Sequence, residues 1–139
     1  MEPQDDLELV DRDGYVEARY LGTYALPRYL DQMARSVRAC EERGRTLLLV
    51  DITDLQGYRP STLERHQIGV TGAALSRGLS KVAALTTPEQ VERNTDAKVK
   101  PADSEPFATT VARNRGLEIR AFVVRAAAVE WLLLPSRKS

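Results

Sequence analysis

The sequence predicts a single α/β domain in which helices pack on a mixed sheet of about five strands that starts with a hairpin. Short apolar stretches of strand character alternate along the chain with longer stretches whose apolar residues recur at helical spacing. The order is two strands followed by mostly alternating helices and strands, which is typical of a sheet with right-handed crossovers. With 139 residues, the whole chain, 1–139, is expected to share one core.

The first two elements are expected to be antiparallel strands followed by a long helix. The stretches "LELVDR" (7–12) and "YVEARYL" (15–21) flank an Asp-Gly dipeptide, which favours the tight turn of a hairpin. In "ALPRYLDQMARSVRACEERG" (25–44) the apolar residues fall on one helical face. Pro27 suits the first turn of this helix and Gly44 suits its end.

Two apolar stretches in the middle of the chain predict strands that are buried on both faces. They are "RTLLLVDI" (45–52) and "KVAALTT" (81–87). The later elements are expected to be a helix at 88–94, a loop at 95–107, a helix ending at Gly116, a strand at 117–124 and a closing helix at 125–134. Residues 46–50, 81–85 and 119–124 are expected to form the centre of the sheet.

The stretch "STLERHQIGVTGAALSRG" (61–78) predicts a helix with a well-defined start. Ser61 or Thr62 can cap it, and Glu64 stands at the position that completes a capping box. Gly78 is expected to end the helix. Its two internal glycines, Gly69 and Gly72, are poor helix formers, which favours a close approach of a neighbouring backbone at this point.

Composition excludes several classes of function. The 20 basic and 20 acidic residues balance, so neither nucleic acid nor an anionic membrane is expected as a partner. One cysteine and one histidine cannot form an internal disulfide or a Cys/His zinc site, and Cys40 is expected to be a buried apolar residue. No membrane-spanning run and no signal sequence are found, so a cytoplasmic location is expected.

The stretch "DITDLQGYRPSTLERH" (51–66) concentrates the polar residues that a site would use. Asp51, Asp54 and His66 suggest acid-base chemistry or magnesium binding, but no phosphate loop, nucleophile motif or second acidic cluster completes either site. Aspartates at such positions more often form turns or caps. No catalytic residue, metal or cofactor is therefore expected, and the chain is not expected to be an enzyme.

Aromatic residues offer a second kind of candidate site. Tyr58, which follows a glycine, either covers the edge of the core or forms the lip of an apolar cleft with Tyr24. Trp131 lies in a closing helix that is apolar almost all round, so it belongs to the core or to a covered surface. The three side chains are the candidate lining of a ligand cleft.

Three stretches resemble the SpoIIAA-like family of small bacterial proteins. They are "LLLVDITDLQGY", "KVAALTT" and the ending "GLEIRAFVVRAAAVEWLLL", in which Ala127, Ala128, Glu130, Trp131 and Leu132 match a recurrent pattern. The family is similar to STAS domains of anti-sigma factor antagonists and, in fold, to CRAL-TRIO lipid-transfer domains. The resemblance covers roughly residues 7–134 and implies the fold more strongly than a function.

The resemblance implies two alternative functions. The first is a non-enzymatic regulatory or interaction module whose partner, such as a kinase-like anti-sigma factor, contacts residues 53–66. The candidate phosphoacceptor and partner-binding residues are Ser61, Thr62, Tyr58, Arg59 and Asp54. In STAS antagonists the acceptor serine follows an aspartate, whereas Arg59-Pro60 stands here, so Ser61 is either a cap, an acceptor or both. The second function is a carrier or sensor of a small apolar ligand, and a homodimer is left open.

Overall fold

The computed structural model describes residues 6–90 and 118–134. Its elements are β1 (Leu7–Arg12), β2 (Tyr15–Tyr20), α1 (Leu26–Arg43), β3 (Leu47–Asp51), α2 (Thr62–Leu75), β4 (Lys81–Leu85), β5 (Ile119–Phe122) and α5 (Arg125–Leu133). The helix expected at 88–94 has begun by residues 88–90. The loop expected at 95–107 and the helix expected to end at Gly116 lie outside the described residues.

The strands form one mixed sheet in the order β1-β2-β3-β4-β5. β1 is antiparallel to β2, and the other neighbours are parallel. The predicted α/β class, five-stranded mixed sheet and N-terminal hairpin are confirmed. The central place predicted for residues 119–124 is wrong, because β5 stands last in the described sheet and its side chains are only partly buried. Apolar character alone does not distinguish an edge strand that is covered on one face from a central strand that is covered on both faces.

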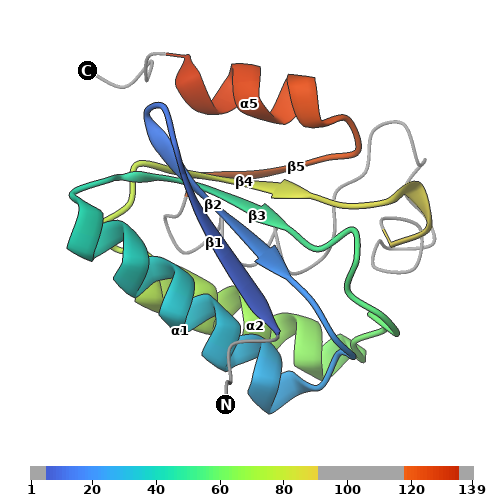
Figure 1. Cartoon of the computed structure of the whole chain (residues 1–139). Coiled ribbons are helices and arrows are strands. Elements are labelled where there is room, and N and C mark those ends of the chain that lie inside the picture. The colour runs from blue at the N-terminus through green and yellow to red at the C-terminus, as the bar shows by residue number, and fades with distance from the viewer. Residues whose placement is uncertain (1–5, 91–117, 135–139) are drawn as a thin grey trace.

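Helices cover both faces of this sheet (Figure 1). On one face, α1 and α2 enclose a core that includes Leu48 and Ile68. On the other, α5 covers Leu49 and contributes its own Leu132 to the second core. Leu48 and Leu49 belong to opposite cores because successive side chains of a strand point to opposite faces. β3 is therefore buried on both sides, as predicted.

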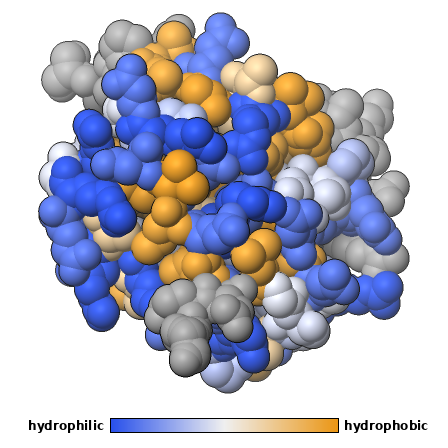
Figure 2. Space-filling model, in the orientation of Figure 1, coloured by the Kyte–Doolittle hydropathy of each residue, from blue (hydrophilic) through white to orange (hydrophobic). Residues whose placement is uncertain are grey.

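Apolar atoms gather at the top of Figure 2, where α5 lies in Figure 1. The largest exposed apolar side chains at this end of the chain are Val123, Val124, Leu133 and Leu134. Only Leu133 of these belongs to α5, so the exposed apolar side chains lie at the two ends of the helix and do not cover its outer side. The buried side chain of Lys81 caps the C-terminal end of α5. Its Nζ donates hydrogen bonds to the carbonyl oxygens of Trp131 and Leu134 at 2.8 and 2.7 Å.

The predicted helix ends are partly confirmed. α1 has a proline in its first turn and ends at Gly44, whose φ of 67° is in the left-handed region that glycine favours. α2 ends at Leu75, three residues before Gly78, because the Ser76 N–H already closes the last turn on Gly72. A Cβ at Gly72 would lie 2.8 Å from Met33 Cε of α1, so the close neighbour at this glycine is a side chain and not the backbone that was expected.

Candidate functional site

The loop between β3 and α2 is held in place by backbone hydrogen bonds. The Leu55 N–H closes a turn on the Ile52 carbonyl at 3.1 Å. Gln56 then exchanges hydrogen bonds with the segment that precedes α1, donating to the Gly22 carbonyl at 2.8 Å and accepting from the Tyr24 N–H at 2.7 Å. Since Ile52, Leu55 and Tyr58 point into the core, the loop presents its remaining side chains from a fixed backbone.

The start of α2 has the predicted capping box. The Glu64 N–H donates to Ser61 Oγ at 3.1 Å, and the Ser61 N–H donates to Glu64 Oε1 at 3.0 Å. Ser61 is therefore the N-cap, and Thr62 is the first helical residue. The Thr62 hydroxyl accepts a hydrogen bond from Arg65 Nη2 at 3.2 Å. Both hydroxyl-bearing residues are exposed.

Leu63 is the most exposed large apolar residue in the described part of the chain, at 69%. Arg59, Ser61 and Thr62 beside it in sequence are also exposed. We call these four residues the helix-start surface. Asp54, also a predicted partner-binding residue, is exposed but forms an ion pair with Arg19 of β2. Sequence reasoning missed Leu63, because apolar spacing does not reveal which face of a helix start lies against the core.

Tyr58 is part of a buried tyrosine cluster. Its ring centroid lies 5.2 Å from that of Tyr24 and 5.4 Å from that of Tyr29, and Tyr29 in turn meets Tyr20 edge-on at 5.4 Å. Burial raises the pKa of Tyr58 to about 12. Tyr58 is only 8% exposed, so its ring mainly completes the core between the loop and α1.

The structure does not bring the three predicted cleft residues together. Tyr24 and Tyr58 belong to the core beneath α1 and α2. Trp131 packs on the opposite face of the sheet, where its ring centroid lies 5.6 Å from that of Phe122 and 4.9 Å from Lys81 Nζ. A single ligand cleft lined by all three side chains is therefore not formed.

A hollow of about 200 Å³ lies beside the loop, where β3 and β4 end. Its lining consists of Thr53, Leu55, Gly57, Tyr58, Arg59, Thr87, Glu89 and Gln90. Most of these side chains are polar, and Gln90 also braces the loop by donating from Nε2 to the Ile52 carbonyl at 2.7 Å. The volume is below the roughly 300 Å³ at which pockets for drug-sized ligands begin.

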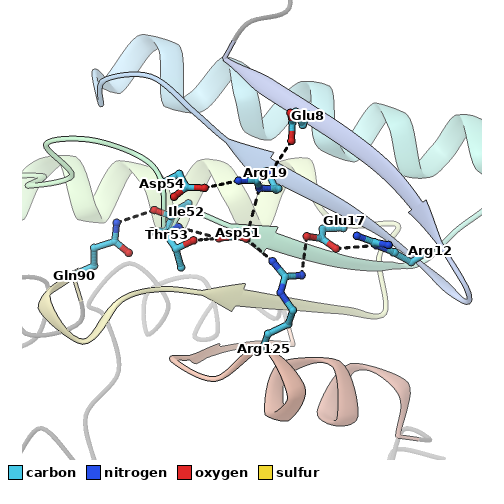
Figure 3. A network of polar contacts seen from close by, with 10 residues as sticks. All are labelled: Glu8, Arg12, Glu17, Arg19, Asp51, Ile52, Thr53, Asp54, Gln90 and Arg125. Atoms are coloured by element: carbon cyan, nitrogen blue, oxygen red, sulfur yellow. Dashed lines mark hydrogen bonds and ion pairs between the residues drawn. The ribbon is translucent and has the colours of Figure 1, made fainter.

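Two buried carboxylates share one arginine beneath α5 (Figure 3). Arg125 donates from Nη1 to Glu17 Oε2 and from Nη2 to Asp51 Oδ2, both at 2.7 Å. Glu17 and Asp51 are 1% and 3% exposed. Burial alone would raise the pKa of Glu17, but hydrogen bonds from Arg125 and Arg12 outweigh it and hold that pKa below its ordinary value. Glu17 is thus kept ionised, and the two carboxylates tie α5 to β2 and β3 through Arg125.

Arg19 extends this network to the surface. It donates to Glu8 Oε1 at 2.8 Å and to Asp54, and its Nε lies 4.0 Å from Asp51 Oδ2. Asp51 also accepts two hydrogen bonds from Thr53, from its N–H at 2.9 Å and its hydroxyl at 2.6 Å. Asp51 therefore forms the turn that sequence reasoning offered as the simpler explanation.

The sheet separates His66 from Asp51 and Asp54, the two aspartates considered with it for catalysis. The Asp51 carboxylate faces α5, whereas His66 is exposed on α2, which packs on the other face. Asp54 is exposed and bound to Arg19. Among residues 6–90 and 118–134, no group of three or more His, Cys, Asp or Glu side chains is placed to hold a metal ion.

Glu17 and Arg125 were missed by sequence reasoning. The only local signal was a charged residue inside a strand that is otherwise buried, with Glu17 between Val16 and Ala18. A buried carboxylate needs cationic partners; Arg12 stands five positions from Glu17, but Arg125 stands 108 residues away in sequence. Nothing in the local pattern pointed to it.

Replacing the N-cap serine is expected to weaken the fold by a modest amount. Ser61→Ala removes the acceptor for the Glu64 N–H, so we expect the free energy of unfolding to fall by about 1 kcal/mol. Urea titration followed by circular dichroism measures this change. Thr62→Ala is the matched control, because its exposed hydroxyl is not the cap. An equal loss in both variants would contradict the assignment of the cap to Ser61.

Comparison with known proteins finds a structural neighbour. No protein-family profile matches the sequence, and no curated protein matches it. A crystal structure of an uncharacterised DUF3478-family protein with a SpoIIAA-like fold, from Shewanella loihica PV-4, aligns over 91% of both chains at 18% identity and a TM-score of 0.49. A likeness at this level assigns no function. No described helix is long and apolar enough to cross a membrane.

Proposed function

We propose that this chain is a non-enzymatic regulatory module that binds a protein partner through the helix-start surface. The observation that carries the proposal is the exposure of Leu63, at 69%, in the first turn of a firmly capped helix. Arg59, Ser61 and Thr62 supply polar groups beside it. An apolar anchor next to polar side chains is the usual arrangement of a binding hot spot and its rim.

The loop geometry supports this proposal. The backbone on both sides of Gln56 is fixed by hydrogen bonds, and the capping box fixes the first turn of α2. A partner therefore meets a surface whose backbone is already ordered, and little conformational entropy is lost there on binding. The partner class that the sequence resemblance implies is a kinase-like anti-sigma factor.

Phosphorylation of Ser61 would make this surface a switch. Glu64 Oε1 accepts from the Ser61 N–H, so its carboxylate lies beside the hydroxyl that would carry the phosphate. The two negative groups would repel each other and open the capping box, while Arg59 and Arg65 are close in sequence and can pair with the phosphate. The added charge would therefore change the surface that a partner contacts.

The alternative function, a carrier of an apolar ligand, has less support. The hollow beside the loop is small and lined mostly by polar side chains, and Trp131 lies on the other face of the sheet. A lipid-like ligand would need a larger apolar space than this hollow offers. The carrier stays an alternative that ligand-binding measurements can address.

Binding through the helix-start surface predicts that Leu63→Asp abolishes partner capture without unfolding the chain. The purified chain is immobilised, incubated with lysate of its source organism, and the captured proteins are quantified by mass spectrometry. We expect at least a tenfold loss of a specific partner with Leu63→Asp, because a charge replaces the apolar anchor. Ser61→Asp is expected to change the captured amount, and Ser61→Ala is expected to leave it unchanged.

Val123→Asp is the matched control, since Val123 is also exposed, at 50%, and lies near α5. It should capture the partner as the wild type does. Thermal melts of all variants separate lost binding from lost folding. Equal recovery of the same proteins by the wild type, Leu63→Asp and Ser61→Asp would contradict the proposal.

A further inference from the structure

β1 is an edge strand with one side open. It pairs with β2, and of the described elements none lies beyond it in the sheet (Figure 1). Glu8, Leu9, Asp11 and Arg12 are exposed, and only Leu7 at the start of the strand is fully buried. An edge of this length presents a row of backbone donors and acceptors to any chain that can pair with it.

The ladder with β2 fixes which backbone groups of β1 face outward. The Leu21 N–H donates to the Asp6 carbonyl at 2.9 Å, so residue 6 directs its polar backbone toward β2. Successive residues of a strand direct these groups to opposite sides. The N–H and carbonyl groups of Leu7, Leu9 and Asp11 therefore face the open side.

The charges on β1 are complementary to a second copy of the same strand. The polar network of Figure 3 begins and ends on β1, and its charges alternate in sign along the whole path. In order, its members are Glu8, Arg19, Asp51, Arg125, Glu17 and Arg12. The two end members lie four positions apart on one face of β1, and their side chains are 51% and 50% exposed.

We propose that β1 pairs antiparallel with β1 of a second copy of this chain, with Val10 of both copies opposite each other on the two-fold axis. This register sets Glu8 of each copy opposite Arg12 of the other, and Leu9 opposite Asp11. The outward groups of Leu9 and Asp11 then form hydrogen-bonded pairs, as the ladder requires. The two sheets become one continuous sheet, and the alternating charges close into a ring.

The register is selected by charge, and the pairing is held by the backbone. Two Leu9–Asp11 pairs supply four backbone hydrogen bonds, while half-exposed ion pairs contribute little to stability. Shifting the strands by two residues would put Glu8 opposite Val10 and leave each Glu8 without its Arg12 partner. A contact this small is expected to be transient, populated at high protein concentration.

Cross-linking through cysteine tests the register. Val10→Cys places two thiols opposite each other across the axis, within reach of a disulfide. Leu9→Cys is the matched control. In this register Leu9 faces Asp11 of the second chain and lies diagonal to Leu9 of that chain. Under mild oxidation we expect Val10→Cys to form a disulfide-linked dimer about tenfold faster than Leu9→Cys. The diagonal distance of about 7–8 Å between the two Leu9→Cys positions is too long for a good disulfide. Cys40 is buried and its pKa is raised to about 11, so it does not compete.

Sedimentation equilibrium of the wild-type chain supplies the second test. The average mass is expected to rise from the 15.5 kDa monomer toward twice that value over a concentration range centred on roughly 100 µM. Leu9→Pro removes an outward N–H without touching the β1–β2 ladder and should stay monomeric. If the melting temperature of Leu9→Pro falls well below that of the wild type, the comparison of Val10→Cys with Leu9→Cys is the test of the proposal. Faster linkage through Leu9→Cys, or a wild-type chain that stays monomeric and unlinked at all concentrations, overturns the proposal.

Discussion

The Leu48→Asp variant is expected to be unfolded. Leu48 is 3% exposed and stands in the centre of the sheet, paired with Val16 of β2 and Val82 of β4. Its side chain points into the core beneath α1 and α2, where a carboxylate would have no partner. Burying such a charge costs several kcal/mol, which is comparable to the 5–15 kcal/mol that usually stabilises a domain.

Circular dichroism and a thermal melt measure this effect. Leu63→Asp makes the same chemical change on a side chain that is 69% exposed, so it should keep the cooperative melt of the wild type. The contrast between the two variants isolates burial as the cause. A soluble Leu48→Asp chain that melts cooperatively near the wild-type temperature would show that β3 is not in the core.

The Arg125→Met variant is expected to lose about 2–3 kcal/mol of stability at neutral pH. Removing one member of a buried ion pair usually costs about 3–5 kcal/mol, and the smaller value reflects an Arg125 side chain that is 46% exposed. The loss arises because Glu17 and Asp51 stay buried without the guanidinium that binds both. Arg38→Met, at an exposed position of α1, is the matched control and should change stability little.

The pH dependence of the same variant follows from Glu17. In the wild type its folded pKa lies below the ordinary value of 4.5, so its contribution is fully present above pH 4.5 and is lost as the pH falls through the folded pKa. Arg125→Met removes the hydrogen bond and the charge of Arg125, so only Arg12 still opposes burial, and the folded pKa of Glu17 is expected to rise relative to the wild type. The stability difference between wild type and variant should therefore be largest near pH 7 and shrink toward pH 3.

Urea titrations of both chains at several pH values measure this difference. A difference that stays constant from pH 7 to pH 3 would show that Arg125 stabilises α5 by packing and not through the ionised carboxylates.

Features that depend on neighbouring residues were predicted well from the sequence. The hairpin turn at Asp13-Gly14 needs a left-handed residue, and Gly14 has a φ of 92°. The capping box needs only Ser61 and Glu64, three positions apart, and both of its hydrogen bonds are present. In both cases the interacting residues lie within four positions of each other, so their spacing in the sequence directly predicts the contact.

Features that depend on distant contacts were predicted poorly. Trp131 was grouped with Tyr58 because both are aromatic, but the sheet separates them. The strand at 119–124 was placed in the centre because it is apolar, although an edge strand under one helix can be equally apolar. The sequence resemblance implied the overall fold, yet Leu63 became a candidate only when its exposure in the structure was known.

The separation of Arg125 from Glu17 also bears on how the chain is made. The ribosome delivers β1 to β4 with α1 and α2 well before α5, because Arg125 follows Glu17 by 108 residues. One face of the nascent sheet can then close over Leu48 while the other still awaits its helix. Until that moment we expect the Glu17 and Asp51 side chains to be hydrated, and polar groups on the unfinished apolar face should discourage it from meeting another nascent chain. The carboxylates that later bind Arg125 of α5 are thus expected to act first as solubilising groups during translation.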